Sequence, residues 1–365
     1  MALCCGLTGC RQKETQNELY SRLHTGVVVV LNRYYYQIGL PGGGKLYFSG
    51  LDADGNLVGL TDDPAEVEPA VLTGTGFFVD DRGSIMTNRH VAQPIIDPTE
   101  VRKNMIEVLR AIKMMCGLRM AELSEAYDAL EQQKRSLYAY AYYGGQMASQ
   151  AQLSDIQRRQ DELRQAYAQL QEAQNSIDSN LDPSAMPITP VCQLGIAYSD
   201  TYVTDIRDFL ERNPCTVSRV SEKSDVDLAL LQLKTKQTPP KAHVFTLADS
   251  GHRSLWQQLA RLQPGHHDAE SVEMGQQLYM IGYNAGLVLA NTRRGIKAQM
   301  TGGKVTQLSD GRRLLYSIPS LQGSSGSPVV DEWGNLVAVN FAKLGNTDNF
   351  NFGIPAEQVR DFLNR

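Results

Sequence analysis

A long helix-forming segment interrupts a chain whose other parts are typical of short β-strands. From about residue 98 to 180, Ala, Leu, Glu, Gln, Arg and Met dominate, and glycine occurs only at Gly117 and the pair Gly144-Gly145. The dominant residues are strong helix formers. Apolar residues recur every seven positions on both sides of the glycine pair: Leu109, Cys116, Leu123, Leu130 and Leu137, then Ile156, Leu163, Leu170 and Ile177. Because a heptad repeat keeps one helix face against a partner, we predict an antiparallel helical hairpin, a coiled coil.

The flanking sequence predicts β-structure. Val27–Leu31 is a continuous apolar, mostly β-branched run that indicates a buried strand. Further strands are expected at 74–79, 84–87, 191–198, 216–220, 228–233, 277–281, 296–305, 314–318 and 336–341, with a closing helix at 355–363. Many short strands with turn signals between them favour an all-β barrel or sandwich. We predict an N-terminal tail at 1–24, one β-domain built from 25–97 and 186–365, and a helical-hairpin insertion at 98–185.

Composition narrows the possible partners. The chain has 35 Lys and Arg against 40 Asp and Glu, with no basic block, so we expect no nucleic-acid partner. The longest apolar run, Val27–Leu31, is too short to cross a membrane. The six cysteines form no Cys-x-x-Cys or Cys/His metal spacing, and His266-His267 has no thiol nearby. We therefore expect neither a metal nor a cofactor.

The N-terminus has two interpretations. Leu7-Thr8-Gly9-Cys10 is similar to a bacterial lipobox, in which the cysteine receives a lipid. The preceding segment is shorter than a signal peptide and lacks its basic start, which a misassigned start codon would explain. Lipidated Cys10 would anchor the protein to a membrane of the bacterial cell envelope, facing the periplasm. In the alternative, the segment is a cytoplasmic tail with chance cysteines.

The chemistry-bearing motif is Gly323-Ser324-Ser325-Gly326-Ser327-Pro328, close to the C-terminus. A serine between small residues can sit on a tight turn, with its hydroxyl exposed and backbone N–H groups aimed at a developing oxyanion. Serine is a weak nucleophile alone and needs a base and a group that orients the base. His90, which closes Thr87-Asn88-Arg89-His90, and Asp227, which opens Asp227-Leu228-Ala229, are candidates for these two roles. The order His, Asp, Ser is one that serine-protease triads use.

On these residues the chain resembles the chymotrypsin-fold serine proteases, most closely their HtrA/Deg and trypsin-like peptidase branch. The matching blocks are Gly-Thr-Gly-Phe-Phe-Val (74–79), Thr-Asn-Arg-His-Val (87–91), Asp-Leu-Ala-Leu-Leu (227–231) and Gly-Ser-Ser-Gly-Ser-Pro (323–328), followed by Asn-Phe-Gly-Ile-Pro (351–355). The resemblance implies a mainly β fold of two six-stranded barrels, with the helical hairpin inserted between the histidine and the aspartate. The chain ends after the protease-like part, so no PDZ domain is expected.

The resemblance also implies the site. Ser325 would be the nucleophile, His90 the general base and then acid, and Asp227 the group that holds the imidazole tautomer. The backbone N–H groups of Gly323 and Ser325 would form the oxyanion hole. Two neighbours of the same residue type, Ser324 and Asp225, are the alternatives if the register is shifted.

The residues expected to form the substrate pocket differ from those of better-known proteases with this fold. Ser327 replaces the second glycine after the nucleophile, and Asn340 stands where glutamyl endopeptidases carry a histidine, so glutamate specificity is not expected. The approach to the nucleophile contains no acid that would select Lys or Arg, which favours a small or apolar substrate side chain. The predicted pocket residues are Ile318, Pro319, Ser320, Asn340 and Phe341.

The sequence therefore predicts a serine endopeptidase that acts on proteins or peptides through an acyl-enzyme, in envelope quality control or regulated processing. The alternative is a catalytically latent or inactive scaffold that binds partners through the hairpin at 98–185. The hairpin has three interpretations: an arm for a partner or self-association, a lid over the active site, or a passive elaboration. Whether Cys192 and Cys215 form a disulfide or remain two thiols also stays open.

Overall fold

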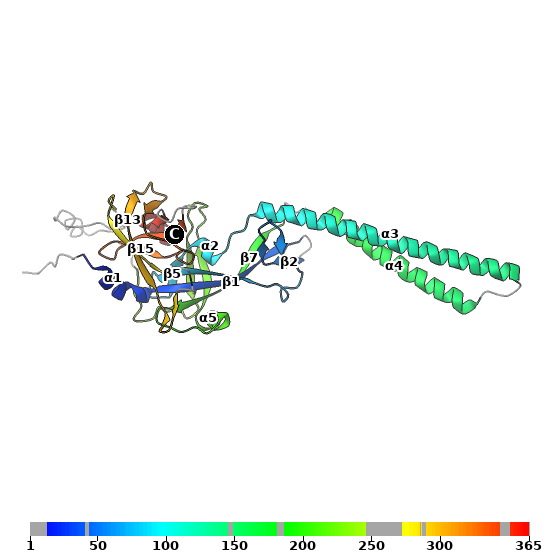
Figure 1. Cartoon of the computed structure of the whole chain (residues 1–365), viewed down its shortest axis with the longest axis horizontal. Helices are drawn as coiled ribbons and strands as arrows, with labels where there is room; N and C mark the ends of the chain where they lie inside the picture. The colour runs from blue at the N-terminus through cyan, green and yellow to red at the C-terminus, as the bar shows by residue number, and fades with distance from the viewer. Residues whose placement is uncertain are drawn as a thin grey trace, which may run out of the picture. The chain divides into compact units, whose positions relative to one another are not determined.

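The structure is a computed structural model that describes residues 13–40, 44–144, 149–180, 186–245, 272–284, 286, 290–343 and 351–364. The chain divides into two compact units. The first contains residues 1–34, 69–95 and 190–365, and the second contains residues 35–68 and 96–189. Helices α3 and α4 and strand β2 belong to the second unit (Figure 1).

The first barrel has six antiparallel strands in the order β1-β5-β6-β9-β8-β7 and closes through pairing of β1 with β7. Its strands are β1 (Val27–Gly39), β5 (Ala70–Phe78), β6 (Ser84–Thr87), β7 (Ile188–Tyr198), β8 (Pro214–Val220) and β9 (Ala229–Leu233). The predicted run Val27–Leu31 begins β1, and all five of its residues have no exposed surface. Its strand neighbour β5 pairs with it in register from Val27 opposite Phe77.

The second barrel is closed and also has six strands, in the order β10-β13-β14-β17-β16-β15. They are β10 (Gln277–Gly282), β13 (Gln299–Gln307), β14 (Leu314–Tyr316), β15 (Pro328–Val330), β16 (Leu336–Lys343) and β17 (Asn351–Pro355). Helix α8 (Ala356–Leu363) follows the last strand, where a closing helix was predicted. The two barrels confirm the predicted fold class: a mainly β chymotrypsin fold with a long helical insertion.

Shorter elements complete the chain. They are α1 (Gln16–Leu23), a 3-10 turn (His24–Gly26), β2 (Lys45–Phe48), β3 (Gly50–Leu51), β4 (Leu57–Val58), α2 (Arg89–Ala92), α5 (Ile206–Arg212), β11 (Asn291–Thr292) and β12 (Gly295–Ile296). No helix among the described residues combines the length and the apolar character needed to span a membrane.

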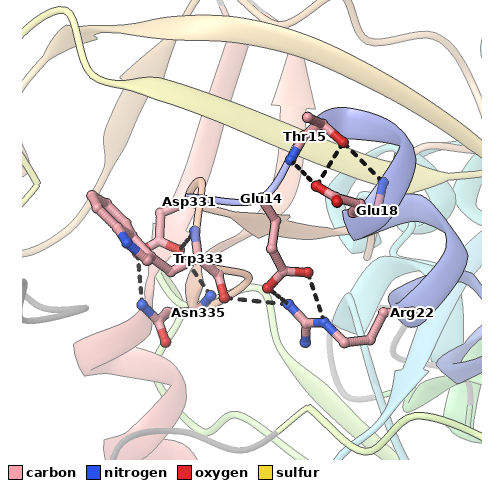
Figure 2. A network of polar contacts seen from close by, with 7 residues as sticks. All are labelled: Glu14, Thr15, Glu18, Arg22, Asp331, Trp333 and Asn335. Atoms are coloured by element: carbon pink, nitrogen blue, oxygen red, sulfur yellow. Dashed lines mark hydrogen bonds and ion pairs between the residues drawn. The ribbon is translucent and has the colours of Figure 1, made fainter. Parts of the chain in front are cut away.

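Residues 16–24 differ from the predicted tail. Gln16–Leu23 form helix α1, and Leu19 and Leu23 are fully buried in the main apolar cluster. Thr15 caps the helix, since its hydroxyl accepts from the Glu18 amide while the Glu18 carboxylate accepts from the Thr15 amide (Figure 2). This capping box, Thr-x-x-Glu, is the sequence signal that would have revealed the helix.

Arg22 connects this N-terminal segment to the turn between β15 and β16 of the second barrel. Arg22 donates from two nitrogens to the Glu14 carboxylate, at 3.0 and 2.6 Å, and also donates to the backbone oxygen of Trp333 (Figure 2). Trp333 lies in the turn between β15 and β16, a few residues after the serine motif. A bidentate arginine–carboxylate pair holds a defined geometry, so residues 14–22 are part of the folded β-unit.

The second unit contains the predicted hairpin. Helix α3 (Pro98–Gly144) and helix α4 (Gln150–Asn180) run side by side (Figure 1). Gln160 donates to Glu131, and Arg164 donates to the Tyr127 hydroxyl. The contact residue on α3 moves back from 131 to 127 as the contact residue on α4 advances from 160 to 164, so the two helices are antiparallel. Residues 35–68, which were predicted to belong to the β-domain, group with this hairpin instead.

His243 gives the folded state a pH dependence. It packs edge-on against Phe245, with ring centroids 4.8 Å apart, and its amide donates to the Thr25 hydroxyl. Burial, with a smaller contribution from the positive charge of Arg22, lowers the pKa of His243 from 6.5 to about 4, and Glu14 opposes this. The unfolded state therefore binds a proton near pH 6.5, whereas the folded state binds it only near pH 4. The free energy of unfolding therefore falls as the pH decreases from about 6.5 to about 4.

We expect His243→Gln to flatten this dependence, because glutamine does not titrate. The measurement is urea unfolding of both proteins at pH 7 and pH 5. The wild type should lose more stability between the two pH values than the variant does. Equal losses would contradict the assignment of this dependence to His243.

Candidate active site

Two neighbouring strand ends bring His90 and Asp227 together. Strand β6 ends at Thr87, which pairs with Ala229 at the start of β9. His90 lies just beyond the end of β6, and Asp227 lies just before the start of β9. His90 Nδ1 is 2.5 Å from Asp227 Oδ2, and the His90 amide donates to Asp227 Oδ1 at 3.0 Å. Both oxygens of the carboxylate therefore face the same histidine.

The loop carrying Asp227 is held by the residues before the histidine. Asn88 donates from Nδ2 to the backbone oxygen of Asp227 at 2.8 Å. The Arg89 guanidinium donates to the carbonyls of Ser221 and Ser224 at 3.2 and 3.4 Å. Asp225, the alternative partner, instead lies 3.7 Å from the Arg312 guanidinium and is half-exposed. The geometry therefore pairs Asp227 with His90, and Asp225 faces away from it.

Asn32 holds the short helix that carries His90, a role that the sequence did not predict. It has no exposed surface, and its Nδ2 donates to the carbonyls of Val91 and Ala92 at 2.9 and 3.0 Å. These carbonyls belong to the short helix α2, which carries His90. The one sequence signal for this role was the position of Asn32, a polar residue directly after the apolar run at 27–31.

The serine motif forms a loop between β14 and β15 in which only Ser325 is accessible. Gly323, Ser324 and residues 326–330 are buried, whereas Ser325 is half-buried. The Ser324 hydroxyl points inward and donates to the Leu321 carbonyl at 2.6 Å. Ser325 is therefore the serine that a substrate can reach.

Thr75 of β5 clamps this loop. Its amide donates to the Ser325 carbonyl at 2.8 Å, and its hydroxyl donates to the Gly323 carbonyl at 2.8 Å. The Thr75 carbonyl accepts from the Thr87 hydroxyl at 2.7 Å. A Cβ on Gly326 would overlap the Thr75 oxygen and lie 3.2 Å from the Asn88 amide. Thr75 thus joins the serine loop to the segment that leads to His90.

The backbone N–H groups of the loop fall into two groups. Ser324 donates to Leu321 O, Gly326 to Asn340 O, and Ser327 to Ser324 O. The N–H groups of Gly323 and Ser325 donate to no acceptor among the described residues. These are the two predicted oxyanion-hole donors, so they are free to bind a developing negative charge.

Gly323 has the conformation that this arrangement requires. The Ser324 amide closes a turn onto Leu321 O at 3.0 Å, and Gly323, third in that turn, has φ +96°. A positive φ at the third position defines a type II turn and favours glycine.

The third member of the site is near the other two without a direct hydrogen bond. The Ser325 hydroxyl makes no hydrogen bond to His90 or to any other residue that the structure describes. Gly74 lies between the histidine segment and the serine loop. A Cβ added to Gly74 would be 2.7 Å from the side chain of Val91, the residue after His90, and 3.3 Å from Ser325 O. Catalytic hydrogen bonds are often long without substrate and tighten when it binds.

The predicted pocket is only partly accessible. Ile318 is fully buried in the second barrel, and Ser320 and Asn340 are 7% and 1% exposed. Asn340 uses its amide for hydrogen bonds inside the protein. These three side chains are therefore enclosed by the protein in this structure, and their role as pocket residues stays a prediction. Pro319 is exposed, and Phe341 is half-buried beside the Arg313 guanidinium.

Ser327, the departure noted in the sequence, is accommodated by a second glycine. Ser327 is fully buried, and a Cβ on Gly282 of β10 would overlap its hydroxyl. The extra side chain at 327 therefore occupies the space that a side chain at 282 would need.

The two cysteines that could have paired do not form a disulfide. Cys192 and Cys215 are free thiols, and burial raises the pKa of Cys215 to about 12. Cys10 lies outside the described residues, as does the pair His266-His267. Within the described part of the chain, no three His, Cys, Asp or Glu side chains gather in a way that could hold a metal ion.

A comparison with known protein families agrees with this fold. Two closed six-stranded barrels with a histidine–aspartate pair and a glycine-flanked serine loop fit the chymotrypsin fold. Residues 199–339 match the family model of the trypsin-like peptidase domain. This segment includes Asp227 and Ser325, while His90 precedes it. No curated protein matches the chain. The match supports a protein of the peptidase class that acts on proteins or peptides.

Proposed function

We propose that the protein is a serine endopeptidase with Ser325 as nucleophile, His90 as general base and Asp227 as the group that orients His90. The observation that carries the proposal is the joint presence of the Asp227–His90 contact at 2.5 Å and two N–H groups, of Gly323 and Ser325, that have no acceptor among the described residues. One feature prepares the base and the other prepares the oxyanion site, and acyl transfer needs both.

The reaction follows from these groups. His90 Nε2 accepts the Ser325 proton as Oγ attacks the peptide carbonyl, and the resulting oxyanion binds the N–H groups of Gly323 and Ser325. His90 then protonates the leaving amine, which departs and leaves an acyl-enzyme on Ser325. Water, deprotonated by His90, attacks the ester and releases the acid. Asp227 stabilises the imidazolium formed in each half.

Covalent labelling with a fluorophosphonate probe tests this proposal. We expect the wild type to be labelled and Ser325→Ala to lose the label. Ser327→Ala is the matched control, because its buried hydroxyl has no hydrogen-bond partner in the described structure and should not be needed for labelling. Equal labelling of wild type and Ser325→Ala would refute the assignment.

The hairpin favours a second candidate function, a binding or scaffolding module. Helix α3 exposes Met114, Met115 and Leu118 by 57–68%, and four tyrosines near its tip are also exposed: Tyr138, Tyr140, Tyr142 and Tyr143. Apolar and aromatic side chains are enriched at binding surfaces. Absence of labelling in both the full-length and the hairpin-deleted protein would favour this function. Labelling of the deleted form alone would indicate that the hairpin controls access to the site.

We also propose, from the sequence around Cys10, a lipid anchor to the bacterial cell envelope. Mass spectrometry of the N-terminal peptide from the native host tests it, and an unmodified Cys10 would rule it out.

A further inference from the structure

We propose that Asn340 is a positioning residue that sets the direction of the Ser325 N–H in the oxyanion hole. This inference rests on the proposed function and extends it to a residue buried beneath the nucleophile loop. Asn340 belongs to β16 and has 1% of its surface exposed. It acts through the backbone of the loop, without touching substrate.

The first observation is the set of carbonyls that the loop turns inward. Thr75 holds the carbonyls of Gly323 and Ser325 from the β5 side. The carbonyl between them, that of Ser324, accepts from Asn340 Nδ2 at 3.1 Å. Asn340 therefore supplies the side-chain contact to the central peptide of the loop.

The second observation is which N–H belongs to that peptide. The Ser324 carbonyl and the Ser325 N–H share one peptide plane, and in a trans peptide the two bonds point in opposite directions. Because Asn340, together with the Ser327 amide, holds the Ser324 oxygen inside the protein, the Ser325 N–H is directed out of it. This N–H is one of the two unpaired donors described above.

The third observation is that Asn340 is itself fixed in one orientation. The Ser324 carbonyl can only accept, so the amide NH2 must face it. On the other side, the Tyr316 hydroxyl donates to Asn340 Oδ1 at 2.8 Å. Burial raises the pKa of Tyr316, which keeps the phenol protonated as a donor. A rotation of the Asn340 amide would break the contact with the Ser324 carbonyl, because two oxygens would then face each other.

Buried serines complete the arrangement. Asn340 Nδ2 also lies 3.2 Å from the Ser320 hydroxyl, and Ser320 and Ser324 share a hydrogen bond of 2.6 Å. The Asn340 backbone adds two further bonds, since its amide donates to Ser327 O and its carbonyl accepts from the Gly326 amide. Side chain and backbone of one residue thus hold both flanks of Ser325.

The test compares Asn340→Asp with Asn351→Asp. Asn351, in β17 of the same barrel, is fully buried and donates from Nδ2 to the Ile318 carbonyl, five residues before Gly323 and outside the serine motif. Both changes replace a buried donor with an acceptor facing a carbonyl, so both should lower the unfolding temperature. Only Asn340→Asp alters the group behind the Ser325 N–H.

We measure kcat and KM on a peptide nitroanilide with an apolar residue at the cleaved bond, and Ki for the matching peptide aldehyde. The aldehyde forms a tetrahedral adduct whose oxygen occupies the oxyanion hole. Losing one oxyanion donor costs about 10²–10³-fold in kcat, and we expect Asn340→Asp to reach the lower end, about 10²-fold. The aldehyde Ki should rise by a similar factor while KM changes less than about threefold, because the N–H acts on the transition state.

The outcomes separate cleanly. If Asn340→Asp loses stability but keeps the kcat and aldehyde Ki of Asn351→Asp, Asn340 is only structural and the proposal is wrong. If KM rises alone, Asn340 is a pocket residue and the proposal is also wrong. Tyr316→Phe covers the case in which Asn340→Asp does not fold. It removes the partner of Asn340 Oδ1 and a hydrogen bond to the Phe352 carbonyl while leaving the Asn340 amide in place. It should lower kcat and weaken aldehyde binding by a smaller factor. An inactive, unlabelled wild type would instead refute the proposed function.

Discussion

Asp227→Asn is expected to lower kcat about 10⁴-fold in a protein that still folds, by forcing the wrong tautomer on His90. The reason lies in the second contact of the carboxylate. Asp227 Oδ1 accepts from the His90 amide at 3.0 Å, and that N–H can only donate. In the variant, the single amide oxygen must stay there, so the NH2 group faces His90 Nδ1.

Nδ1 would then accept a hydrogen bond, and the imidazole proton would move to Nε2. A protonated Nε2 cannot take the proton of Ser325, so attack on the substrate is suppressed. The measurements are kcat on a peptide nitroanilide and the ¹⁵N chemical shifts of His90, which distinguish the two tautomers. Asp225→Asn is the matched control, because this half-exposed carboxylate two residues away faces Arg312. Similar losses in both variants, or an unchanged His90 tautomer in Asp227→Asn, would contradict this role of Asp227.

Gly323→Ala is expected to lower kcat by about 10²–10³-fold, the effect of losing one oxyanion donor. Gly323 has φ +96°, which an L-alanine rarely adopts, and its added Cβ would lie 2.5 Å from the Tyr283 carbonyl. A type I turn keeps the closing hydrogen bond from Ser324 to Leu321 and avoids the positive φ. It does so by flipping the peptide between Gln322 and Gly323, which turns the Gly323 N–H away from the oxyanion.

Gly275→Ala provides the control for backbone strain. Gly275 has φ +78°, and a Cβ there would meet nothing within 4 Å. Gly275→Ala places alanine at a positive φ, at a cost of roughly 1–2 kcal/mol, without touching the site, whereas Gly323→Ala changes a donor of the site. We expect thermal unfolding to shift in both and the aldehyde Ki to rise in Gly323→Ala alone. Wild-type kcat in a folded Gly323→Ala would show that its N–H is not needed.

The residues around His90, Asp227 and Ser325 could be recognised from sequence because each lies in a short motif whose conformation is local. Thr87-Asn88-Arg89-His90 ends a strand, Asp227 opens one, and the glycines around Ser325 mark tight turns. The hairpin was equally accessible, since Leu123 and Ile156 occupy heptad positions and are 8% and 3% exposed. In each case the determining interactions lie within a few residues of the motif.

The pocket could not be predicted in the same way. Asn340 lies within β16, whose residues do not alternate regularly between apolar and polar, and β16 changes register with β17 between Asn340 and Ala342. A register shift decides which side chains face the interior, and its position depends on the partner strand. Asn32 and Thr75 were missed for a related reason: each acts on a loop far away in sequence.

By itself, the sequence determined the mainly β class, the position of the helical insertion and the three residues proposed to carry the reaction. Local propensity, heptad spacing and turn chemistry are sufficient for these. Only the tertiary structure decided that Asp227 and not Asp225 faces His90, that Ser324 points inward while Ser325 is accessible, and that Asn340 lies beneath the loop. Each of these depends on which carbonyl or amide a distant strand brings within hydrogen-bonding distance, and barrel closure sets that arrangement.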